Sequence, residues 1–228
     1  MTSPATILIT GASRGLGAEL TKIFLDRGFN VFATARTADS IAAPIGAKGE
    51  LVRHALDVAS YQQCRTAIET CMERFGAIDA LINNASAYTG GKSIADTPED
   101  EINLELDVTL RGGIYMSSLF AKAMRPKKKG NIFFISSTAG LLRGPGRKYG
   151  SLYGAAKAAL IRYSECLNED IADFGMQSHV LIPGNIRDSG FVDERAVSYT
   201  DIGKLILFML EQGDNLSLSQ VMIRPARI

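Results

Sequence analysis

The sequence predicts an α/β fold of the three-layer, doubly wound type, in which one parallel sheet of about seven strands carries helices on both faces. Three observations lead to this prediction. Short apolar runs alternate along the chain with longer stretches of helical periodicity. The short runs are largely apolar, as expected for strands that helices cover on both sides. A turn rich in glycine follows the first run directly and opens the first helical stretch.

Strands are predicted at the apolar runs, which occupy residues 6–10, 30–34, 51–56, 79–83, 131–135, 178–182 and 220–224. Helices are predicted between them from apolar residues spaced three or four apart, beginning near residue 16 and then covering about 61–75, 99–124, 153–174 and 201–211. Gly28 and Gly76 are expected to end the first two helices. Strict alternation implies parallel strands joined by right-handed crossovers. No repeat, low-complexity tract or linker interrupts residues 1–228, which we interpret as one domain.

The composition is that of an ordinary globular protein, with 46% hydrophobic residues, 21% charged residues and a net charge of +1. A charge this close to zero gives no general reason to expect nucleic acid or a membrane as a partner. The basic run at 127–129 is interpreted as a solvated helix end. Neither a signal peptide nor a run of about 20 apolar residues is evident, so we expect a cytoplasmic protein without a membrane span.

Cysteine and histidine are few. Cys64, Cys71 and Cys166 form no paired pattern, which favours free thiols in a reducing compartment. The first two lie seven residues apart on a predicted helix and are interpreted as small buried hydrophobic residues. His54 and His179 fall in strand-like runs and are interpreted as structural residues, so no metal site is predicted.

The most informative pair of residues is Tyr153 and Lys157. They lie four residues apart at the start of a predicted helix, which places both side chains on one face. An ammonium group beside a phenol favours the phenolate, and we therefore expect Lys157 to lower the pKa of Tyr153 and make it a poised acid. Taken alone, the same spacing also fits a surface tyrosine and lysine on an ordinary helix.

The glycine turn spans Thr10 to Gly17, with the spacing Gly-x-x-x-Gly-x-Gly. At the first strand-to-helix turn of an alternating chain, such a turn lets the backbone approach a pyrophosphate. The helix N-terminus then supplies amide donors and a favourable dipole. The residues of this turn that we expect to contact a dinucleotide are Gly11, Ser13, Arg14, Gly15, Leu16 and Gly17.

Five short motifs occur in order along the chain: Thr10-Gly11-x-x-x-Gly15-x-Gly17, Asn83-Asn84-Ala85, Ser136-Ser137, Tyr153-x-x-x-Lys157 and Pro183-Gly184. Together they resemble the short-chain dehydrogenase/reductase family, over nearly the whole chain from Thr6 to Arg224. The resemblance implies a Rossmann fold, a nicotinamide cofactor, and hydride transfer between that cofactor and a carbonyl or alcohol.

The resemblance also implies catalytic roles. Tyr153 would give a proton to the developing alkoxide, and Lys157 would tune Tyr153 and hold the ribose hydroxyls. Ser137 would bind the substrate oxygen, with Ser136 pointing the other way because side chains alternate along a strand. Thr109 replaces an asparagine that often anchors a relay water in the family, and a hydroxyl can hold a water with fewer donors.

Cofactor choice can be argued from charge. A carboxylate at the end of the second strand would favour NAD(H), but that position is Ala35, followed by Arg36. Arg36 and Arg14 can clamp a phosphate between two guanidinium groups, which predicts NADP(H). The alternative is that both arginines merely face solvent.

Further cofactor contacts follow from the resemblance. Asp57 and Val58 match the pair that contacts adenine, and the other positions are Asn84, Ala85, Pro183, Gly184 and Ile186. Two positions depart from the family pattern. Asp188 stands where a threonine usually lies near the nicotinamide carboxamide, and Ser86 stands where glycine is usual.

The substrate is expected to be a small-molecule carbonyl or alcohol. The segment 189–199 is a short substrate-binding lid by comparison with the family, which would suit a bulky or carrier-tethered substrate. Basic residues in the loops that should border the cleft would suit an anionic one, or are plain loop charges: Arg143, Arg147, Lys148 and Arg187. A homodimer or homotetramer is expected. The alternatives to a reductase are a non-redox enzyme of the same fold, such as an isomerase or dehydratase, and a non-catalytic dinucleotide sensor.

Overall fold

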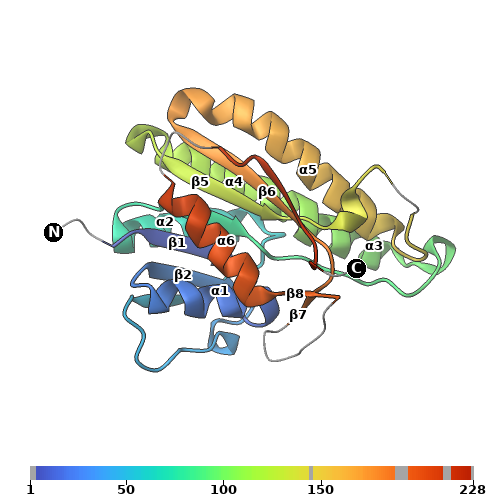
Figure 1. The fold of residues 1–228 in the computed structure, drawn as a ribbon, viewed down its shortest axis with the longest axis horizontal. Coiled ribbons are helices and arrows are strands. Elements are labelled where there is room, and N and C mark those ends of the chain that lie inside the picture. The colour runs from blue at the N-terminus through green and yellow to red at the C-terminus, as the bar shows by residue number, and fades with distance from the viewer. Residues whose placement is uncertain (1–3, 144–145, 188–194, 213–216, 227–228) are drawn as a thin grey trace.

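The structure, a computed structural model of the chain, describes residues 4–143, 146–187, 195–212 and 217–226. Within these residues, seven strands form one parallel sheet in the order β3-β2-β1-β4-β5-β6-β9 (Figure 1). The predicted doubly wound sheet is thereby confirmed. The crossing from one half of the sheet to the other lies between β1 and β4, where a ligand is expected outside the carboxyl ends of the strands.

The strands of this sheet are β1 (Thr6–Thr10), β2 (Asn30–Ala35), β3 (Leu51–Ala55), β4 (Ala80–Asn83), β5 (Gly130–Ile135), β6 (Met176–Pro183) and β9 (Gln220–Ile223). The helices are α1 (Gly15–Asp26), α2 (Tyr61–Phe75), α3 (Glu99–Leu106), α4 (Gly112–Met124), α5 (Ser151–Ile171) and α6 (Tyr199–Glu211). Short helical turns are η1 (Ala38–Ser40), η2 (Ile94–Asp96), η4 (Arg125–Lys127), η5 (Thr138–Gly140) and η6 (Ala172–Phe174). Most boundaries lie within two residues of the sequence prediction.

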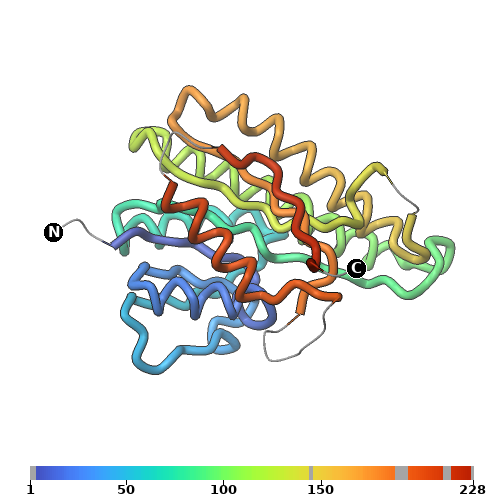
Figure 2. Tube along the Cα trace, in the orientation of Figure 1, coloured from blue at the N-terminus to red at the C-terminus, as the bar shows by residue number. Residues whose placement is uncertain are grey.

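Helices cover both faces of the sheet, as the tube in Figure 2 also shows. One face packs against α1 and α6, and the other against α2, α4 and α5. Alternation along β1 decides which side chain meets which layer: Leu8 belongs to the core under α2 and α4, whereas Ile7 and Ile9 belong to the core under α1 and α6. All three side chains are fully buried. The largely apolar runs of the central strands β1, β4 and β5 follow from this double coverage, whereas the edge strand β3 exposes Arg53.

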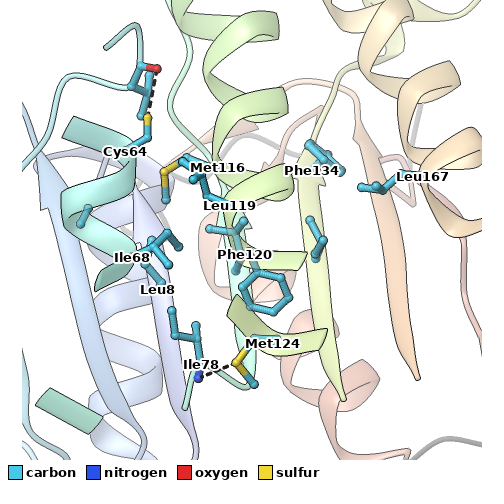
Figure 3. Close-up of a cluster of buried hydrophobic side chains, with 14 of the residues drawn as sticks. Leu8, Cys64, Ile68, Ile78, Met116, Leu119, Phe120, Met124, Phe134 and Leu167 are labelled. Atoms are coloured by element: carbon cyan, nitrogen blue, oxygen red, sulfur yellow. Dashed lines mark hydrogen bonds between the residues drawn. The ribbon is translucent and has the colours of Figure 1, made fainter. Parts of the chain in front are cut away.

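The core between α2, α4 and the sheet contains two sulfur contacts (Figure 3). Cys64 Sγ donates to the Val58 carbonyl over 3.4 Å, and Met124 Sδ accepts from the Ile78 amide at the same distance. In the described chain all three cysteines are free thiols, as predicted, with Cys64 and Cys71 buried. Burial raises the pKa of each of these two thiols to about 12, so they act as small hydrophobic residues.

The long helix predicted at 99–124 contains a π-helical segment, η3 (Asp107–Arg111), between α3 and α4. The backbone stays helical through both junctions, so the rod is continuous. A π segment adds a residue to a turn and rotates the side chains that follow, which an apolar spacing pattern does not reveal. Thr109 lies in the middle of η3 and is buried.

A second, two-stranded sheet was not predicted. It pairs β7 (Ile186–Arg187) with β8 (Val197–Ser198), directly before α6. Asp188 and most of the predicted substrate lid lie outside the described residues. No helix in the ranges that the structure describes is long and apolar enough to cross a membrane.

Candidate active site

The glycine turn between β1 and α1 accepts only glycine at two of its positions. A Cβ on Gly17 would lie 2.2 Å from the Gly11 carbonyl oxygen, and one on Gly11 would lie 2.9 Å from the Ala85 Cα. Gly11 and Gly15 also have positive φ angles of 68° and 58°, which favour glycine. The turn therefore keeps an open cradle of backbone beside the start of α1.

The N-terminus of α1 is free to bind an anion. Arg14 is its N-cap residue and makes no side-chain capping bond, and in the described chain no acidic residue lies in the first turn. The first amides of a helix lack intrahelical partners, and the helix dipole favours negative charge at this end. The predicted pyrophosphate site at residues 11–17 thus has the required donors and the required shape.

Asn84 supports this turn from β4. Its side-chain Nδ2 donates to the carbonyl oxygens of Thr10 and Gly11, both over 3.0 Å, which uses both amide hydrogens. The Thr10 hydroxyl in turn accepts from the backbone amides of Asn84 and Ala85 at 3.1 Å. The amide group of Asn84 thereby holds the cradle in shape.

The predicted adenosine end lies at the carboxyl ends of β2 and β3. Ala35 is buried at the end of β2, and the Arg36 that follows it is exposed, as is Arg14 on the neighbouring turn. Asp57 Oδ1 accepts from the Ala59 amide at 3.0 Å, which shapes the loop after β3. Val58 is buried against α4, where a Cβ on Gly112 would come within 2.7 Å of Val58 Cγ2.

The other side of the cleft starts at the end of β6. Pro183 is the last residue of that strand, and the Gly184 amide donates to the Ile223 carbonyl over 2.9 Å. Ile186, half-buried, begins β7. These three predicted cofactor positions and the glycine turn all follow the carboxyl ends of parallel strands, and so lie along one edge of the sheet.

Ser136 and Ser137 both act on α5, but at different residues of that helix. Ser136 is buried, and its hydroxyl donates to the Lys157 carbonyl over 2.8 Å, which anchors α5 to the end of β5. Ser137 acts on the Tyr153 phenol and lowers its pKa, and its Oγ accepts from the Ala139 amide at 3.1 Å. A Cβ on Gly140 would lie 2.6 Å from the Lys157 carbonyl carbon, so the loop packs closely on α5.

Lys157 is almost completely buried, with 3% of its surface exposed. Its Nζ donates to the Ile135 carbonyl over 2.7 Å and lies 5.5 Å from the centre of the Tyr153 ring. Burial penalises the ammonium form and lowers the pKa of Lys157 to about 8. The predicted juxtaposition of Tyr153 and Lys157 on one helix face is present.

The expectation that Tyr153 has a lowered pKa is wrong for this structure. Burial raises the pKa of the phenol, and this outweighs the hydrogen bond from Ser137 and the positive charge of Arg147, which both lower it. Tyr88 and Glu105 add smaller upward contributions to the pKa. The Lys157 ammonium is directed to a backbone carbonyl. Tyr153 therefore holds its proton firmly in the protein alone.

The Thr109 hydroxyl is occupied by the segment after β4. It accepts from the Ala87 amide at 3.1 Å, lies 3.2 Å from Ser86 Oγ, and donates to the Ala87 carbonyl over 3.4 Å. A hydroxyl has one hydrogen and two lone pairs, and these three contacts use them. The structure thus gives Thr109 a role in holding the loop, in contrast to the predicted water anchor.

The basic loop residues differ in their surroundings. Arg147 acts electrostatically on Tyr153, whereas Lys148 lies 4.8 Å from the centre of the Tyr149 ring. Arg143 and Arg187 are exposed. In the described chain no three His, Cys, Asp or Glu side chains lie close enough together to hold a metal ion.

Sequence reasoning missed two neighbours of Tyr153. Tyr88 packs edge-on against it, with ring centres 5.3 Å apart and planes at 70°. Glu105 is buried on α3 and borders a hollow that Tyr153 also lines. In the sequence Glu105 is one of several acidic residues of a polar helix, and only its apolar neighbours on the same turn, Leu104 and Leu106, set it apart.

Comparison with known proteins agrees with this site. Residues 5–197 match the short chain dehydrogenase family. The chain is 35% identical over 181 residues to Oxidoreductase BOA17 of Botryotinia fuckeliana, which is 78% of this chain and 65% of that protein. It is 33% identical over 183 residues to the 3-oxoacyl-(acyl-carrier-protein) reductase FabG of Salmonella typhimurium, covering 78% and 72%. With 3-ketodihydrosphingosine reductase of Bacteroides thetaiotaomicron it shares 31% over 195 residues, covering 86% and 68%.

Solved structures show the same architecture. A metagenomic short-chain oxidoreductase in complex with NADP superposes with a TM-score of 0.85 and 26% identity, covering 98% of this chain and 99% of that one. Serine dehydrogenase from Escherichia coli superposes with a TM-score of 0.83 at 22% identity, covering 96% and 97%, and shares the fold. With its parallel sheet, glycine cradle and Ser137, Tyr153 and Lys157 in one place, the chain belongs to the short-chain dehydrogenase family, oxidoreductases that use nicotinamide cofactors.

Proposed function

We propose that this protein is an NADP(H)-dependent oxidoreductase that interconverts a carbonyl compound and its alcohol, with Tyr153 as the general acid and base. One observation carries the proposal. Ser137, whose hydroxyl lowers the pKa of the Tyr153 phenol, and the buried Lys157 both lie beside Tyr153 at the carboxyl end of β5. The hydroxyls of Ser137 and Tyr153 can then both contact one substrate oxygen.

The residues present fit a nicotinamide dinucleotide. The cradle at Gly11 and Gly17, which a Cβ would fill, and the uncapped start of α1 supply space and amide donors for its pyrophosphate. The residues that would hold the rest are Arg14, Arg36, Asp57, Val58, Lys157, Pro183, Gly184 and Ile186. When bound, the nicotinamide gives or takes the hydride.

Tyr153 would supply the proton. Because burial raises its pKa, the phenol is protonated at neutral pH and can donate to the oxygen of a carbonyl as that oxygen becomes an alkoxide. Ser137 would hold the same oxygen and limit its movement. In the opposite direction Tyr153 must first lose its proton, and the positive charge of Arg147 favours that loss.

Lys157 would bind the ribose hydroxyls of the cofactor and hold the start of α5 in position. One of its three N–H groups is used by the Ile135 carbonyl, and two remain for ribose hydroxyls or a water. Its carbonyl oxygen accepts from Ser136, so the same residue also fixes the start of α5 to β5. This double attachment fixes the first turn of α5, which carries Tyr153, relative to the end of β5.

The preference for NADP(H) rests on charge. Arg14 and Arg36 are exposed at the ends of neighbouring structural elements, and Ala35 stands where a carboxylate would repel a 2′-phosphate. The metagenomic short-chain oxidoreductase that superposes on this chain is a complex with NADP. We infer that the two guanidinium groups bind the 2′-phosphate.

The substrate class is inferred from the relatives. Two of them are named 3-ketodihydrosphingosine reductase and 3-oxoacyl-(acyl-carrier-protein) reductase, so both names specify a 3-oxo or 3-keto group. We infer a ketone carried on a longer chain, which agrees with the bulky or carrier-tethered substrate expected from the sequence. A panel for this protein starts with 3-ketoacyl thioesters and includes simple ketones, aldehydes and quinones.

The test measures NADPH consumption with each member of the panel, and the fall in nicotinamide absorbance reports that consumption. Turnover that disappears in Tyr153→Phe, with NADPH binding retained, supports the proposal. Tight NADPH binding with no consumption of NADPH by any carbonyl would contradict it and favour a sensor. Chemical change of a substrate without net NADPH consumption would contradict it in favour of an isomerase or dehydratase.

A further inference from the structure

The irregular segment that follows β4, residues 84–92, is tied to one face of the neighbouring helix. Glu105 Oε1 accepts from both the amide and the hydroxyl of Thr89, at 2.6 and 2.7 Å. One turn further on, Thr109 holds the backbone of Ala87 through its amide and its carbonyl. The segment itself forms no strand or helix over 84–90, so these side chains supply partners that its backbone would otherwise lack.

A third contact extends the same pattern. Glu101, one turn before Glu105, pairs with Lys92 over 2.7 Å. Positions 101, 105 and 109 follow one another at four-residue intervals, and their partners at 92, 89 and 87 run in the opposite direction. Residues four apart share a helical face, so one face of the helix fastens the whole segment. We call these three contacts the loop clamp.

The loop clamp holds Tyr88. This residue lies between Ala87 and Thr89, which are both fastened, and its ring packs edge-on against Tyr153. Tyr88 is 51% exposed, so part of this residue is free to contact a ligand. A displacement of the segment would move this ring away from Tyr153. Tyr88 is therefore placed as a wall for whatever binds at the Tyr153 hydroxyl.

Burying the Glu105 carboxylate costs more free energy than holding a loop would require. It is 2% exposed, and within the described residues its Oε2 has no hydrogen-bond partner. A buried unpaired acceptor costs about 1–3 kcal/mol, and more when charged. A glutamine could accept the same two bonds from Thr89. The negative charge reaches Tyr153, where it acts with Tyr88 and against Arg147 and Ser137.

We propose that Glu105 is a positioning residue, which holds Thr89 so that Tyr88 forms one wall of the substrate site beside Tyr153. Tyr88 is then a specificity-determining residue, whose exposed part faces the bound substrate. The proposal rests on the proposed function in one respect, that Tyr153 acts on that substrate. Glu105 itself does not touch the reacting atoms.

The first measurement needs no turnover. The exchange rate of the Thr89 amide hydrogen, measured by NMR on the NADPH complex, reports directly whether the loop clamp is formed. We expect faster exchange in Glu105→Ala, which removes the acceptor, and wild-type exchange in Glu105→Gln, which keeps it. Unchanged exchange in Glu105→Ala would overturn the positioning role.

The second measurement separates the Michaelis constant from kcat. In Glu105→Ala we expect the KM for the carbonyl substrate to rise about tenfold to a hundredfold, since small displacements in a site have effects of this size. The dissociation constant of NADPH should stay within about threefold of wild type, because the glycine cradle is not touched. Glu105→Gln should restore KM, and an equal loss in both variants would overturn the proposal.

Two further variants keep the test decisive. Thr89→Val removes one of the two bonds from the loop side and leaves Glu105 in place, so it serves if Glu105→Ala does not fold. It should raise KM in the same direction but less, and a wild-type KM would count against the clamp. Glu99→Ala, an exposed acidic residue of the same helix, is the matched control and should leave KM and Thr89 exchange unchanged.

The titration of Tyr153 gives a third readout. Removing the Glu105 charge in Glu105→Gln should move the phenol titration to lower pH, measured from phenolate absorbance against the same protein carrying Tyr153→Phe. A titration at unchanged pH would show that Glu105 does not face Tyr153 and would overturn the placement. If Tyr153→Phe retains turnover, the proposed function fails, while the Thr89 exchange result still decides the clamp.

Discussion

The Lys157 ammonium donates a 2.7 Å hydrogen bond to the Ile135 carbonyl, at the last residue of β5. The same lysine accepts a hydrogen bond from Ser136 through its own carbonyl, so α5 and β5 are joined at two atoms. This attachment fixes the first turn of α5, on which Tyr153 stands, relative to Ser137. It also buries a cation, and burial has a measurable consequence for stability.

Stability should depend on pH through Lys157. Its pKa is lowered from the ordinary value of 10.5 to about 8, so between these values the unfolded chain binds a proton that the folded protein does not. The free energy of unfolding therefore rises with pH across this window, by about 3 kcal/mol for this residue alone. Chemical denaturation of the wild type and of Lys157→Met at several pH values measures the free energy of unfolding of each. The difference between these two free energies should change by about 3 kcal/mol across the window.

The variant comparison removes a competing effect. The buried thiols of Cys64 and Cys71 have pKa values of about 12, so alkaline pH ionises them in the unfolded chain first and lowers stability in both proteins. This loss cancels in the difference. Parallel stability curves for wild type and Lys157→Met would show that Lys157 is charged and well solvated in the folded state.

Tyr153→Phe should abolish the chemistry and spare binding. The substitution removes only the phenolic hydroxyl, and the ring can keep its edge-on contact with Tyr88. Loss of a general acid typically costs about a hundredfold to ten-thousandfold in kcat. NADPH binding, followed by fluorescence, should stay within about threefold of wild type. A variant that still turns over at a tenth of the wild-type rate would exclude Tyr153 as the proton donor.

Gly17→Ala should disrupt the cradle, because its new Cβ would lie 2.2 Å from a backbone carbonyl oxygen and 2.6 Å from Asn84 Nδ2. We expect NADPH affinity to fall at least about a hundredfold and the melting temperature to drop. Gly15→Ala is the matched control. Its Cβ would meet nothing nearer than 3.6 Å, so the cost is only the strain of φ at 58°, about 1–2 kcal/mol. Equal losses in the two variants would contradict the steric argument.

The sequence was informative where one physical rule decides the outcome. Strands covered on both faces must be apolar, and a backbone cradle needs glycine, so the sheet and the turn at Gly11 to Gly17 could be predicted. These features depend on short-range spacing, which a sequence displays directly.

The sequence was less informative where several distant groups compete. The pKa direction of Tyr153 depends on burial by the surrounding elements and on Arg147, Tyr88 and Glu105, which no spacing rule brings together. The role of Thr109 depends on its contacts with Ser86 and Ala87 in the segment after β4, which no spacing rule brings together with it. The sequence shows that a threonine, Thr109, stands where the family often has an asparagine. It does not show that the Thr109 hydroxyl binds the backbone of Ala87 and not a water.

The choice between NADP(H) and NAD(H) should follow two side chains. Arg36→Asp places a carboxylate after β2, where it would accept hydrogen bonds from ribose hydroxyls and repel a 2′-phosphate. We expect kcat/KM for NADPH to fall about a hundredfold and the value for NADH to rise, since loss of a forked guanidinium contact and a new repulsion both act on the phosphate. Arg14→Ala should reduce NADPH efficiency less, because it removes attraction only. The matched control is Arg53→Ala, which removes an exposed arginine of β3 and should leave the ratio of the two cofactors unchanged. A wild-type protein that already prefers NADH, or an unaltered ratio in Arg36→Asp, would show that the two arginines only face solvent.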